Sequence, residues 1–238
     1  MKIVIVGAGR AGNSFATALR KVGHDVELRH HERLDFPHEI DLVLLCVPDD
    51  KLIETAARME LGPNTVLAHC AGSRRLDVLG SHRRVASLHP LVALPEPTVG
   101  ARRLIGAAYC VAGDERASEV VNSLGGRAFS LSNEQRAAYH ATACVAANHL
   151  VALMGHVARL AEGAGLELAD FLPLAHSALD DVDHYGPSGA LTGPASRGDL
   201  VTIDAHLQAI PEEERATYVT LANAALLLAE RTSVAGSF

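Results

Sequence analysis

The chain has 238 residues, 48% of them hydrophobic and 21% charged, with a formal net charge of −7. This length accommodates one large domain or two modest ones, and the composition excludes wholesale disorder. The acidic balance and an aromatic content of only 4% argue against a nucleic-acid-binding surface.

The first half of the chain alternates apolar strand patterns with helical ones. Asp41–Val47 is almost entirely apolar, as a central parallel strand is when both of its faces are covered. This alternation predicts βαβ units and a mostly parallel sheet. We expect strands at Lys2–Val6, Val26–His30, Asp41–Val47, Thr65–His69, Val85–Leu88, Ala107–Ala112 and Ala128–Leu131, and helices at Asn13–Val22 and Lys51–Met59, the second capped by Asp49 or Asp50.

The pattern becomes helical after residue 131. Ser132 and Gln135 have the spacing of a capping box, and a long helical pattern runs from Glu134 to about Gly163. The predicted fold class is therefore α/β: a domain with a mostly parallel sheet over residues 1–131, followed by an all-α domain over residues 132–238. Further helices are expected at Ala169–Asp183, Asp199–Ala209 and Pro211–Arg231.

A glycine motif of the form GxGxxG follows the first predicted strand and opens a helix. Gly7 permits the tight turn, Gly9 lets the backbone approach a pyrophosphate, and Gly12 lets the helix pack closely on the strand. The start of the helix then offers N–H groups to the phosphates. The predicted dinucleotide-binding loop consists of Gly7, Ala8, Gly9, Arg10, Ala11 and Gly12.

The end of the second predicted strand bears on the choice of cofactor. An acidic residue there usually holds the ribose of NAD, whereas basic residues receive the 2′-phosphate of NADP. The strand tip here is His30 and His31, with Arg33 close by, which favours NADP. Glu32 lies twenty residues after Gly12, a spacing that keeps NAD as an alternative.

Further ligand-binding candidates follow the next strands of the predicted sheet. Val47 ends the third predicted strand and Pro48 follows it, at the carboxyl edge where open α/β sheets bind ligands. His69 and His89 mark the ends of the fourth and fifth strands. An imidazole at either position is a candidate proton donor, although a single histidine is more often structural.

Two more candidates lie in the long predicted helix, where His140 and Asn148 interrupt a run of small residues. Asn148 would orient a substrate carbonyl and His140 would protonate it, unless His140 is only an interfacial polar residue. A Gly/Pro-rich segment farther along carries Thr192 and Arg197. Arg197 is suited to binding a substrate carboxylate through two hydrogen bonds.

Taken together, these motifs resemble a family of bacterial proteins that join a Rossmann-like domain to a C-terminal domain of unknown function, DUF2520. The matching segments are GAGRAG (7–12), VPDD (47–50), HCAG (69–72), SLHPL (87–91), YHA (139–141), AANHLVAL (146–153) and ALTGPASRGD (190–199). The family usually has Ser where this chain has Ala71.

The resemblance implies NADP binding and the reduction of a small 2-oxo or imino acid. The family is similar to pyrroline-5-carboxylate reductase, ketopantoate reductase and the 6-phosphogluconate dehydrogenase group, and it points to ketopantoate as the leading single substrate. That larger group often carries Lys-x-x-x-Asn, with the Lys as proton donor. Here Asn148 matches the Asn, but Cys144 occupies the Lys position, so His140, His89 or His69 would have to take the role.

The missing lysine motivates a second hypothesis, a protein that binds NADP(H) without catalysis as a sensor or partner subunit. A metal-dependent enzyme is a third reading, but the 13 histidines show no metal-ligand spacing, so no metal is expected.

The cysteines form no CxxC pair, and we expect a cytoplasmic protein with no membrane partner. The apolar helices predict a homodimer.

Overall fold

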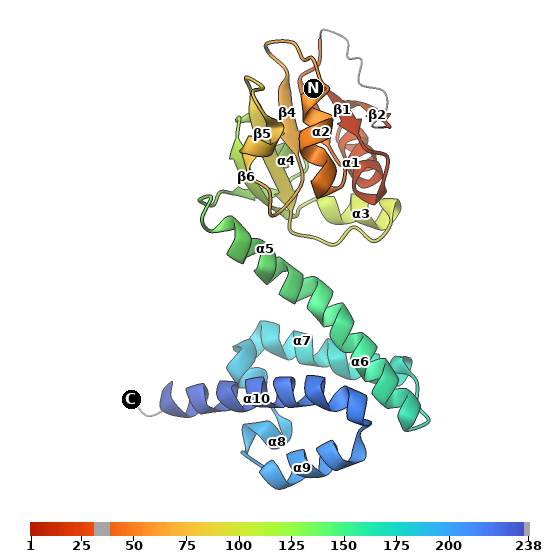
Figure 1. Cartoon of the computed structure of the whole chain (residues 1–238), viewed down its shortest axis with the longest axis vertical. Helices are drawn as coiled ribbons and strands as arrows, with labels where there is room; N and C mark the ends of the chain where they lie inside the picture. The colour runs from red at the N-terminus through yellow and green to blue at the C-terminus, as the bar shows by residue number, and fades with distance from the viewer. Residues whose placement is uncertain (31–38, 236–238) are drawn as a thin grey trace. The chain divides into compact units, whose positions relative to one another are not determined.

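The computed structural model describes residues 1–30 and 39–235, the last five by backbone alone. The chain forms two compact units, Met1–Ala147 and Asn148–Phe238 (Figure 1). The first holds the sheet and the second is helical, so the predicted fold class is confirmed. A domain boundary at residue 132 stays a prediction.

The sheet has seven strands in the order β2-β1-β3-β4-β5-β6-β7. Each strand is parallel to its neighbours except that β6 runs antiparallel to β5. Because β2 and β3 flank β1 on opposite sides, the strand order reverses at β1, where such sheets bind ligands. The strands are β1 (Lys2–Val6), β2 (Asp25–Arg29), β3 (Leu42–Leu45), β4 (Val66–His69), β5 (Val85–Pro90), β6 (Ala108–Gly113) and β7 (Arg127–Phe129).

Helices cover both faces of the sheet, which explains why the central strands are apolar throughout. Alternate residues of β1 and β3 point to opposite faces. Ile3 and Leu42 pack with α1 (Arg10–Lys21), α3 (Pro97–Leu104) and α4 (Arg116–Ser123). Val4 and Val43 pack on the other face, against α2 (Leu52–Ala57) and the short helix Leu76–Leu79.

Two of these helices, α3 and α4, are absent from the sequence-based expectation, and each has only eight residues. The Glu96 carboxylate caps α3 by accepting hydrogen bonds from the backbone N–H groups of Thr98 and Val99. A Cβ atom on Gly100 would come within 2.2 Å of Ser14 Oγ on α1. The two helices therefore lie side by side (Figure 1), and this contact has no local sequence signature.

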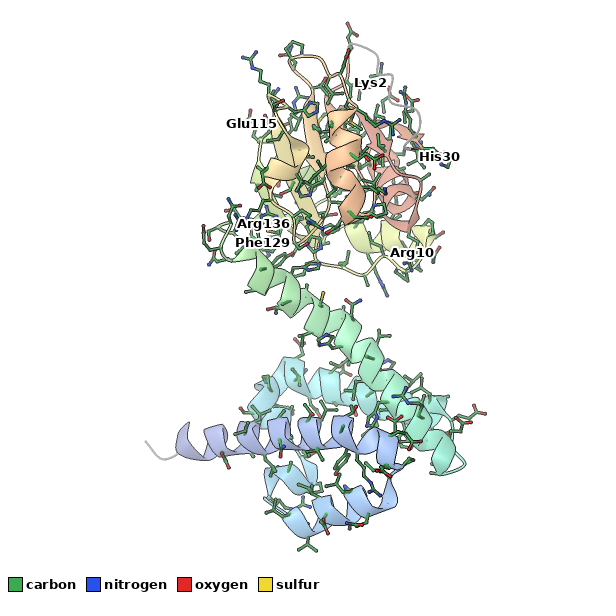
Figure 2. The ribbon with its side chains drawn as sticks, in the orientation of Figure 1. Lys2, Arg10, His30, Glu115, Phe129 and Arg136 are labelled. Carbon is green, nitrogen blue, oxygen red and sulfur yellow. The ribbon has the colours of Figure 1, made fainter. Side chains whose placement is uncertain are left out.

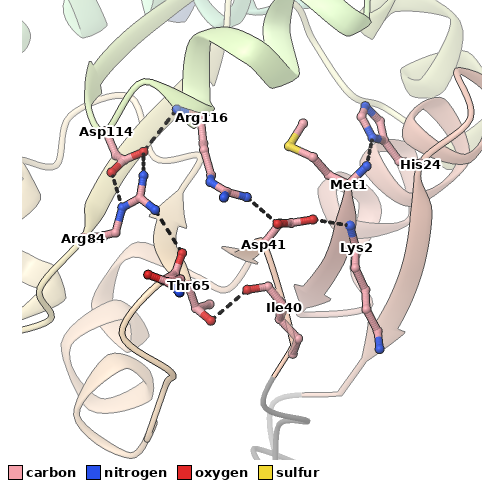
Figure 3. Close-up of polar contacts among 10 residues, drawn as sticks. Met1, Lys2, His24, Ile40, Asp41, Thr65, Arg84, Asp114 and Arg116 are labelled. Atoms are coloured by element: carbon pink, nitrogen blue, oxygen red, sulfur yellow. Dashed lines mark hydrogen bonds and ion pairs between the residues drawn. The ribbon is translucent and has the colours of Figure 1, made fainter.

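The amino edge of the sheet is held by charged hydrogen bonds (Figure 3). Arg116 donates to Asp41 at 2.5 Å, and Asp41 also accepts from the backbone N–H of Lys2. Arg84 forms two hydrogen bonds with Asp114, at 2.7 and 2.9 Å. These contacts lie at the end opposite the carboxyl edge of the parallel strands, so they serve the structure of the sheet.

The long predicted helix differs from expectation in one respect. Arg136–Gly163 is helical throughout, but Val145–His149 forms a π-helical turn between α5 (Arg136–Cys144) and α6 (Leu150–Gly163). A π turn closes its hydrogen bonds between residues five apart, where an α-helix closes them between residues four apart. Residues four apart across this turn therefore do not lie on one face, as they would in a regular α-helix. This segment is also the one helix of the described chain long and apolar enough, by length and composition, to cross a membrane.

The helical unit is joined by a buried polar contact between α6 and α10 (Glu212–Ala235). The Glu214 carboxylate accepts a hydrogen bond from Arg159 and lies 2.5 Å from His156 Nδ1. Hydrogen bonding to Arg159 and then to His156 lowers the pKa of Glu214 to about 2, so its charge persists in weak acid. The unit continues through α7 (Leu168–Ala190), with non-helical dihedral angles at Gly186, then α8 (Gly193–Ser196), α9 (Leu200–Ala209) and α10 (Glu212–Ala235).

Candidate functional site

The sheet unit gathers its candidate ligand-binding residues at the carboxyl edge of the parallel strands. The glycine loop follows β1, Val47 and Pro48 follow β3, and His69 ends β4. Figure 2 shows Arg10 and Arg136 at this edge, whereas Lys2 and Glu115 lie at the opposite end of the unit. Residues distant in sequence therefore meet where such folds bind ligands.

The glycine loop has the tight packing that its three glycines predict. Gly7 has a φ of +111°, and a Cβ atom on it would lie 2.5 Å from the carbonyl oxygen of Cys46. A Cβ atom on Gly12 would lie 1.8 Å from the carbonyl oxygen of Gly7. Space is open only above Gly9, where a Cβ atom would meet nothing within 4 Å.

The start of α1 is suited to an anion. Gly9 is the N-cap residue, so no side chain caps the helix, and the first turn carries no acidic residue. The N–H groups of a first helical turn have no acceptor within the helix, and the helix dipole favours negative charge there. Together with the space above Gly9, these N–H groups fit a pyrophosphate.

The residues predicted to select the cofactor are described only in part. β2 ends at Arg29, whose guanidinium forms an ion pair with Glu27 at 2.7 Å. His30 follows as an exposed residue. His31, Glu32 and Arg33 lie outside the described residues, so the preference for NADP over NAD rests on their sequence alone.

His69 holds the loop that follows β4. Its Nδ1 accepts a hydrogen bond from the N–H of Ala71, and its Nε2 lies 3.3 Å from the carbonyl oxygen of Arg75. Burial lowers the pKa of His69 to about 4, so the ring is neutral near pH 7. Backbone groups contact both ring nitrogens of His69, so its ring holds the shape of this loop. The role of His69 in cofactor binding stays a prediction.

His89 and Tyr139 form a neutral hydrogen-bonded pair. The hydroxyl of Tyr139 lies 2.7 Å from Nδ1 of His89. Burial, followed by the charges of His140 and Arg136, lowers the pKa of His89 to about 4. Burial also raises the pKa of Tyr139 to about 12. His89 is therefore an unprotonated imidazole at neutral pH, suited to orient a ligand rather than to act as a strong acid.

His140 packs beside this pair, and Gly72 makes the packing possible. The rings of His89 and His140 have centroids 5.9 Å apart. A Cβ atom on Gly72 would lie 2.5 Å from His140 Cδ2 and 2.8 Å from His89 Nε2. Because a side chain at position 72 would clash with both rings, the glycine of the HCAG segment brings the two histidines together.

The sequence patterns do not identify Arg136 as a site residue. In the structure it is buried, with only 2% of its surface exposed. It donates to the carbonyl oxygen of Arg74 at 3.1 Å and to the hydroxyl of Ser87 at 2.9 Å. In the described part of the chain, no carboxylate lies within ion-pair distance of its guanidinium. It is three residues before Tyr139 and four before His140, so all three share one helix face, a spacing that could have indicated it.

Asp49 does not cap the following helix, contrary to the expectation that Asp49 or Asp50 does so. The short helix Asp49–Lys51 begins after Pro48 without a side-chain cap. The Asp49 carboxylate instead accepts a hydrogen bond from the Ser73 hydroxyl, 3.2 Å away in the loop after β4. It therefore links two loops of the carboxyl edge.

The remaining candidates belong to the helical unit. Asn148 is an exposed residue of the π-helical turn. Thr192 precedes α8 as its N-cap residue, and Arg197 follows α8 with an exposed side chain. Asp199 caps α9 through a 3.0 Å hydrogen bond from the N–H of Thr202. The substrate-binding roles of Asn148, Thr192 and Arg197 stay predictions.

Within the described residues, no group of three or more His, Cys, Asp or Glu side chains is arranged to hold a metal ion. The side chains that this edge gathers beside the glycine loop are imidazoles, a phenol and a buried guanidinium. A doubly wound sheet with such a loop defines a dinucleotide-binding type of fold.

The family described as domain of unknown function DUF2520 matches residues 107–225, and the chain belongs to this family. Comparison with curated proteins finds no match.

Several solved structures share the fold. One is a protein from Bacteroides fragilis with a provisional NADP oxidoreductase assignment, 20% identical over 94% of this chain and 97% of that chain, with a TM-score of 0.78. Protein TM1727 from Thermotoga maritima is 22% identical over 97% of this chain and 99% of its own, with a TM-score of 0.74. A reductive aminase from Aspergillus terreus, in complex with NADPH and ethyl levulinate, is 19% identical over 94% and 93%, with a TM-score of 0.65.

The neutral histidines of the edge predict an acid-sensitive sheet unit. Histidine in an unfolded chain has a pKa near 6.5, against about 4 for His69 and His89 when folded. Between these values the unfolded chain binds protons that the folded chain does not, so stability is lost as the pH falls from 6.5 towards 4. The loss should reach a few kcal/mol, since one pKa unit corresponds to about 1.4 kcal/mol.

Urea denaturation at pH 7 and pH 4.5 measures this effect. A His89→Gln variant should lose less stability between the two pH values than the unmodified protein, because one of the two histidines is gone. Equal losses in both proteins would contradict a buried neutral His89.

Proposed function

We propose that this protein is an NADP-dependent oxidoreductase that reduces a small 2-oxo or imino acid, with ketopantoate as the first candidate substrate. The observation that carries the proposal is the shared edge of the sheet, where an uncapped glycine-loop helix and a cluster of histidine, tyrosine and arginine side chains meet. Structures with this fold include a reductive aminase with NADPH and a Plasmodium falciparum pyrroline carboxylate reductase with NADP.

In this proposal the N–H groups of the first turn of α1 bind the pyrophosphate, and the open space above Gly9 admits it. Val47 and Pro48 border the dinucleotide where it crosses the end of β3. The bound NADPH would supply a hydride to the carbonyl or imine carbon. The preference for NADP over NAD rests on the non-acidic strand tip at His30 and His31.

The residues of this chain would then bind the substrate and transfer the proton. His140 is proposed as the proton donor, because His89 is held neutral by its surroundings. His89 would orient the reacting group, and the buried charge of Arg136 favours a substrate with a negative charge nearby. Asn148, Thr192 and Arg197 of the helical unit are proposed as substrate-binding residues.

Cys144 stands at the position where the larger group that this family resembles often carries a proton-donating lysine, and this difference supports a second candidate function. A protein that binds NADP(H) without turnover would need no acid there. Turnover of any 2-oxo or imino acid with NADPH excludes this alternative. Binding of NADPH with no turnover across a panel of such acids favours it.

A Gly9→Ala variant tests the cofactor site. The added methyl group meets no protein atom within 4 Å, so the fold should be retained while the approach of the pyrophosphate is blocked. We expect NADPH affinity to fall at least about tenfold, equivalent to about 1.4 kcal/mol. Fluorescence titration measures affinity and a thermal melt measures stability, with Gly163→Ala in the helical unit as the matched control.

In the same titration, the unmodified protein should bind NADPH about tenfold more tightly than NADH. Unchanged NADPH affinity in Gly9→Ala would contradict the assignment of the loop.

A His140→Ala variant tests the proposed proton donor. Loss of a general acid typically slows turnover by about 10²–10⁴-fold, while NADPH affinity should hardly change. Steady-state kinetics with ketopantoate and a panel of 2-oxo and imino acids measures turnover. His149→Ala, an exposed histidine nine residues along the same helix, is the control. A decrease of less than about threefold would remove His140 from this role.

We infer further that the helical unit pairs with a second copy of itself. No residue of α7 is buried, and Val151, Leu174 and Val201 are 72%, 68% and 83% exposed. Exposed apolar surface on this scale is typical of an interface. A lipid bilayer is less suited to cover this apolar surface. Arg159 places a charge on α6 and Glu214 places one beside it, and charges are costly inside a membrane.

Light scattering at micromolar concentration should therefore give the mass of a dimer. Val151→Glu should shift the population towards monomer, because a charge would be buried in the interface. Ile53→Glu places the same charge on an exposed apolar position of the sheet unit, 64% exposed, and should leave the dimer intact. A monomeric unmodified protein would contradict the inference.

A further inference from the structure

Two cysteines lie side by side beneath the glycine loop. Cys46 follows β3 and Cys70 follows β4, directly after the register partners Leu45 and His69. Their sulfur atoms are 3.7 Å apart. Neither Cys110 in β6 nor Cys144 in α5 has a second thiol within hydrogen-bonding distance, so this is the one thiol pair among the four cysteines, all of which are free.

The positions of Cys46 and Cys70 suit a disulfide. Neighbouring strands lie about 4.8 Å apart, and disulfides join Cα atoms about 4.4–6.8 Å apart. Closing the sulfur–sulfur distance from 3.7 Å to the bond length of about 2.05 Å therefore requires rotation of the side chains together with a small approach of Cys46 and Cys70 to each other.

Cys46 is also the residue on which the glycine loop packs. A Cβ atom added to Gly7 would lie 2.5 Å from the carbonyl oxygen of Cys46. A Cβ atom added to Gly12 would lie 3.4 Å from the Cβ atom of Cys46. Two of the three motif glycines thus contact one cysteine. A shift of Cys46 towards Cys70 would be transmitted to the loop, because no space separates them.

We propose that Cys46 and Cys70 form a reversible disulfide that weakens dinucleotide binding by the glycine loop. Formation of the disulfide stands on the thiol geometry alone, whereas its effect on binding rests on the proposed function. Since coupling between two equilibria is reciprocal, a bound dinucleotide should in turn oppose disulfide formation.

The oxidant is a small-molecule disulfide such as oxidised glutathione. The thiolate of Cys70 attacks one glutathione sulfur, which forms a mixed disulfide and releases one glutathione. Cys46 then attacks the Cys70 sulfur, forms the protein disulfide and releases the second glutathione. Two protein thiols and one glutathione disulfide thus become one protein disulfide and two glutathione thiols. The hydrogen bond with Cys70, together with burial, raises the pKa of Cys46, which assigns the first attack to Cys70.

The experiment incubates the full-length protein at graded ratios of oxidised to reduced glutathione. Intact mass and peptide mapping detect the disulfide, and fluorescence titration measures NADPH affinity before and after dithiothreitol. A Cys110→Ala/Cys144→Ser double variant retains the proposed pair and should behave like the unmodified protein. Cys46→Ser should stop at the mixed disulfide of Cys70 with glutathione, Cys70→Ser should lack even that adduct, and neither variant should yield a Cys46–Cys70 peptide.

We expect a Cys46–Cys70 peptide, a fall in NADPH affinity of about tenfold, recovery with dithiothreitol, and slower oxidation in saturating NADPH. Absence of that peptide at every ratio would overturn the disulfide. A disulfide-linked protein with unchanged NADPH affinity would overturn the coupling alone. Reduced protein that binds no dinucleotide would overturn the coupling together with the proposed function.

Discussion

Gly7 packs its Cα against the carbonyl oxygen of Cys46, at a distance that leaves no room for a Cβ atom. The turn after β1 can therefore close only with glycine, and its closure sets the direction in which α1 leaves the sheet. Gly12 then packs on the carbonyl of Gly7 in the same way. These backbone contacts leave the N–H groups at the start of α1 facing outwards at the edge of the sheet, where an anion can reach them.

The other half of the site depends on a second constraint, the burial of Arg136. Its guanidinium bridges the loop after β4 and strand β5 through Arg74 and Ser87. This contact fixes the first turn of α5 against the sheet, so that Tyr139 and His140 face His89. The buried positive charge also contributes to the low pKa of His89. Arg136 thus both positions His140 beside His89 and favours the neutral state of His89.

Much of the fold was predictable from sequence because it depends on local patterns. All seven strands lie where apolar runs indicate them, and α1 begins at Arg10, within the glycine motif and three residues before the predicted start. What was missed depends on contacts between distant residues. Helix α3 packs on α1 through Gly100, and the π-helical turn at Val145–His149 interrupts a sequence that reads as one regular helix.

The candidate site divides in the same way. The glycines, His69 and His89 were identified because they follow strands that end at one edge. Arg136 and Tyr139 were not assigned roles, because an arginine near a helix start is usually a surface residue, and nothing local indicates that its guanidinium is buried. Asp49 was expected to cap a helix, but its partner Ser73 belongs to another loop. Side-chain contacts between loops leave no periodic pattern in the sequence, so sequence patterns do not predict them.

The central claim is that the glycine loop and the histidine cluster serve one ligand. A crystal structure of the protein with NADP⁺ tests this most directly. We expect the pyrophosphate on the N–H groups of the first turn of α1, beside Gly9, and the nicotinamide ring at the carboxyl edge near His89 and His140. A dinucleotide bound away from the loop, or a nicotinamide directed away from both histidines, would contradict it.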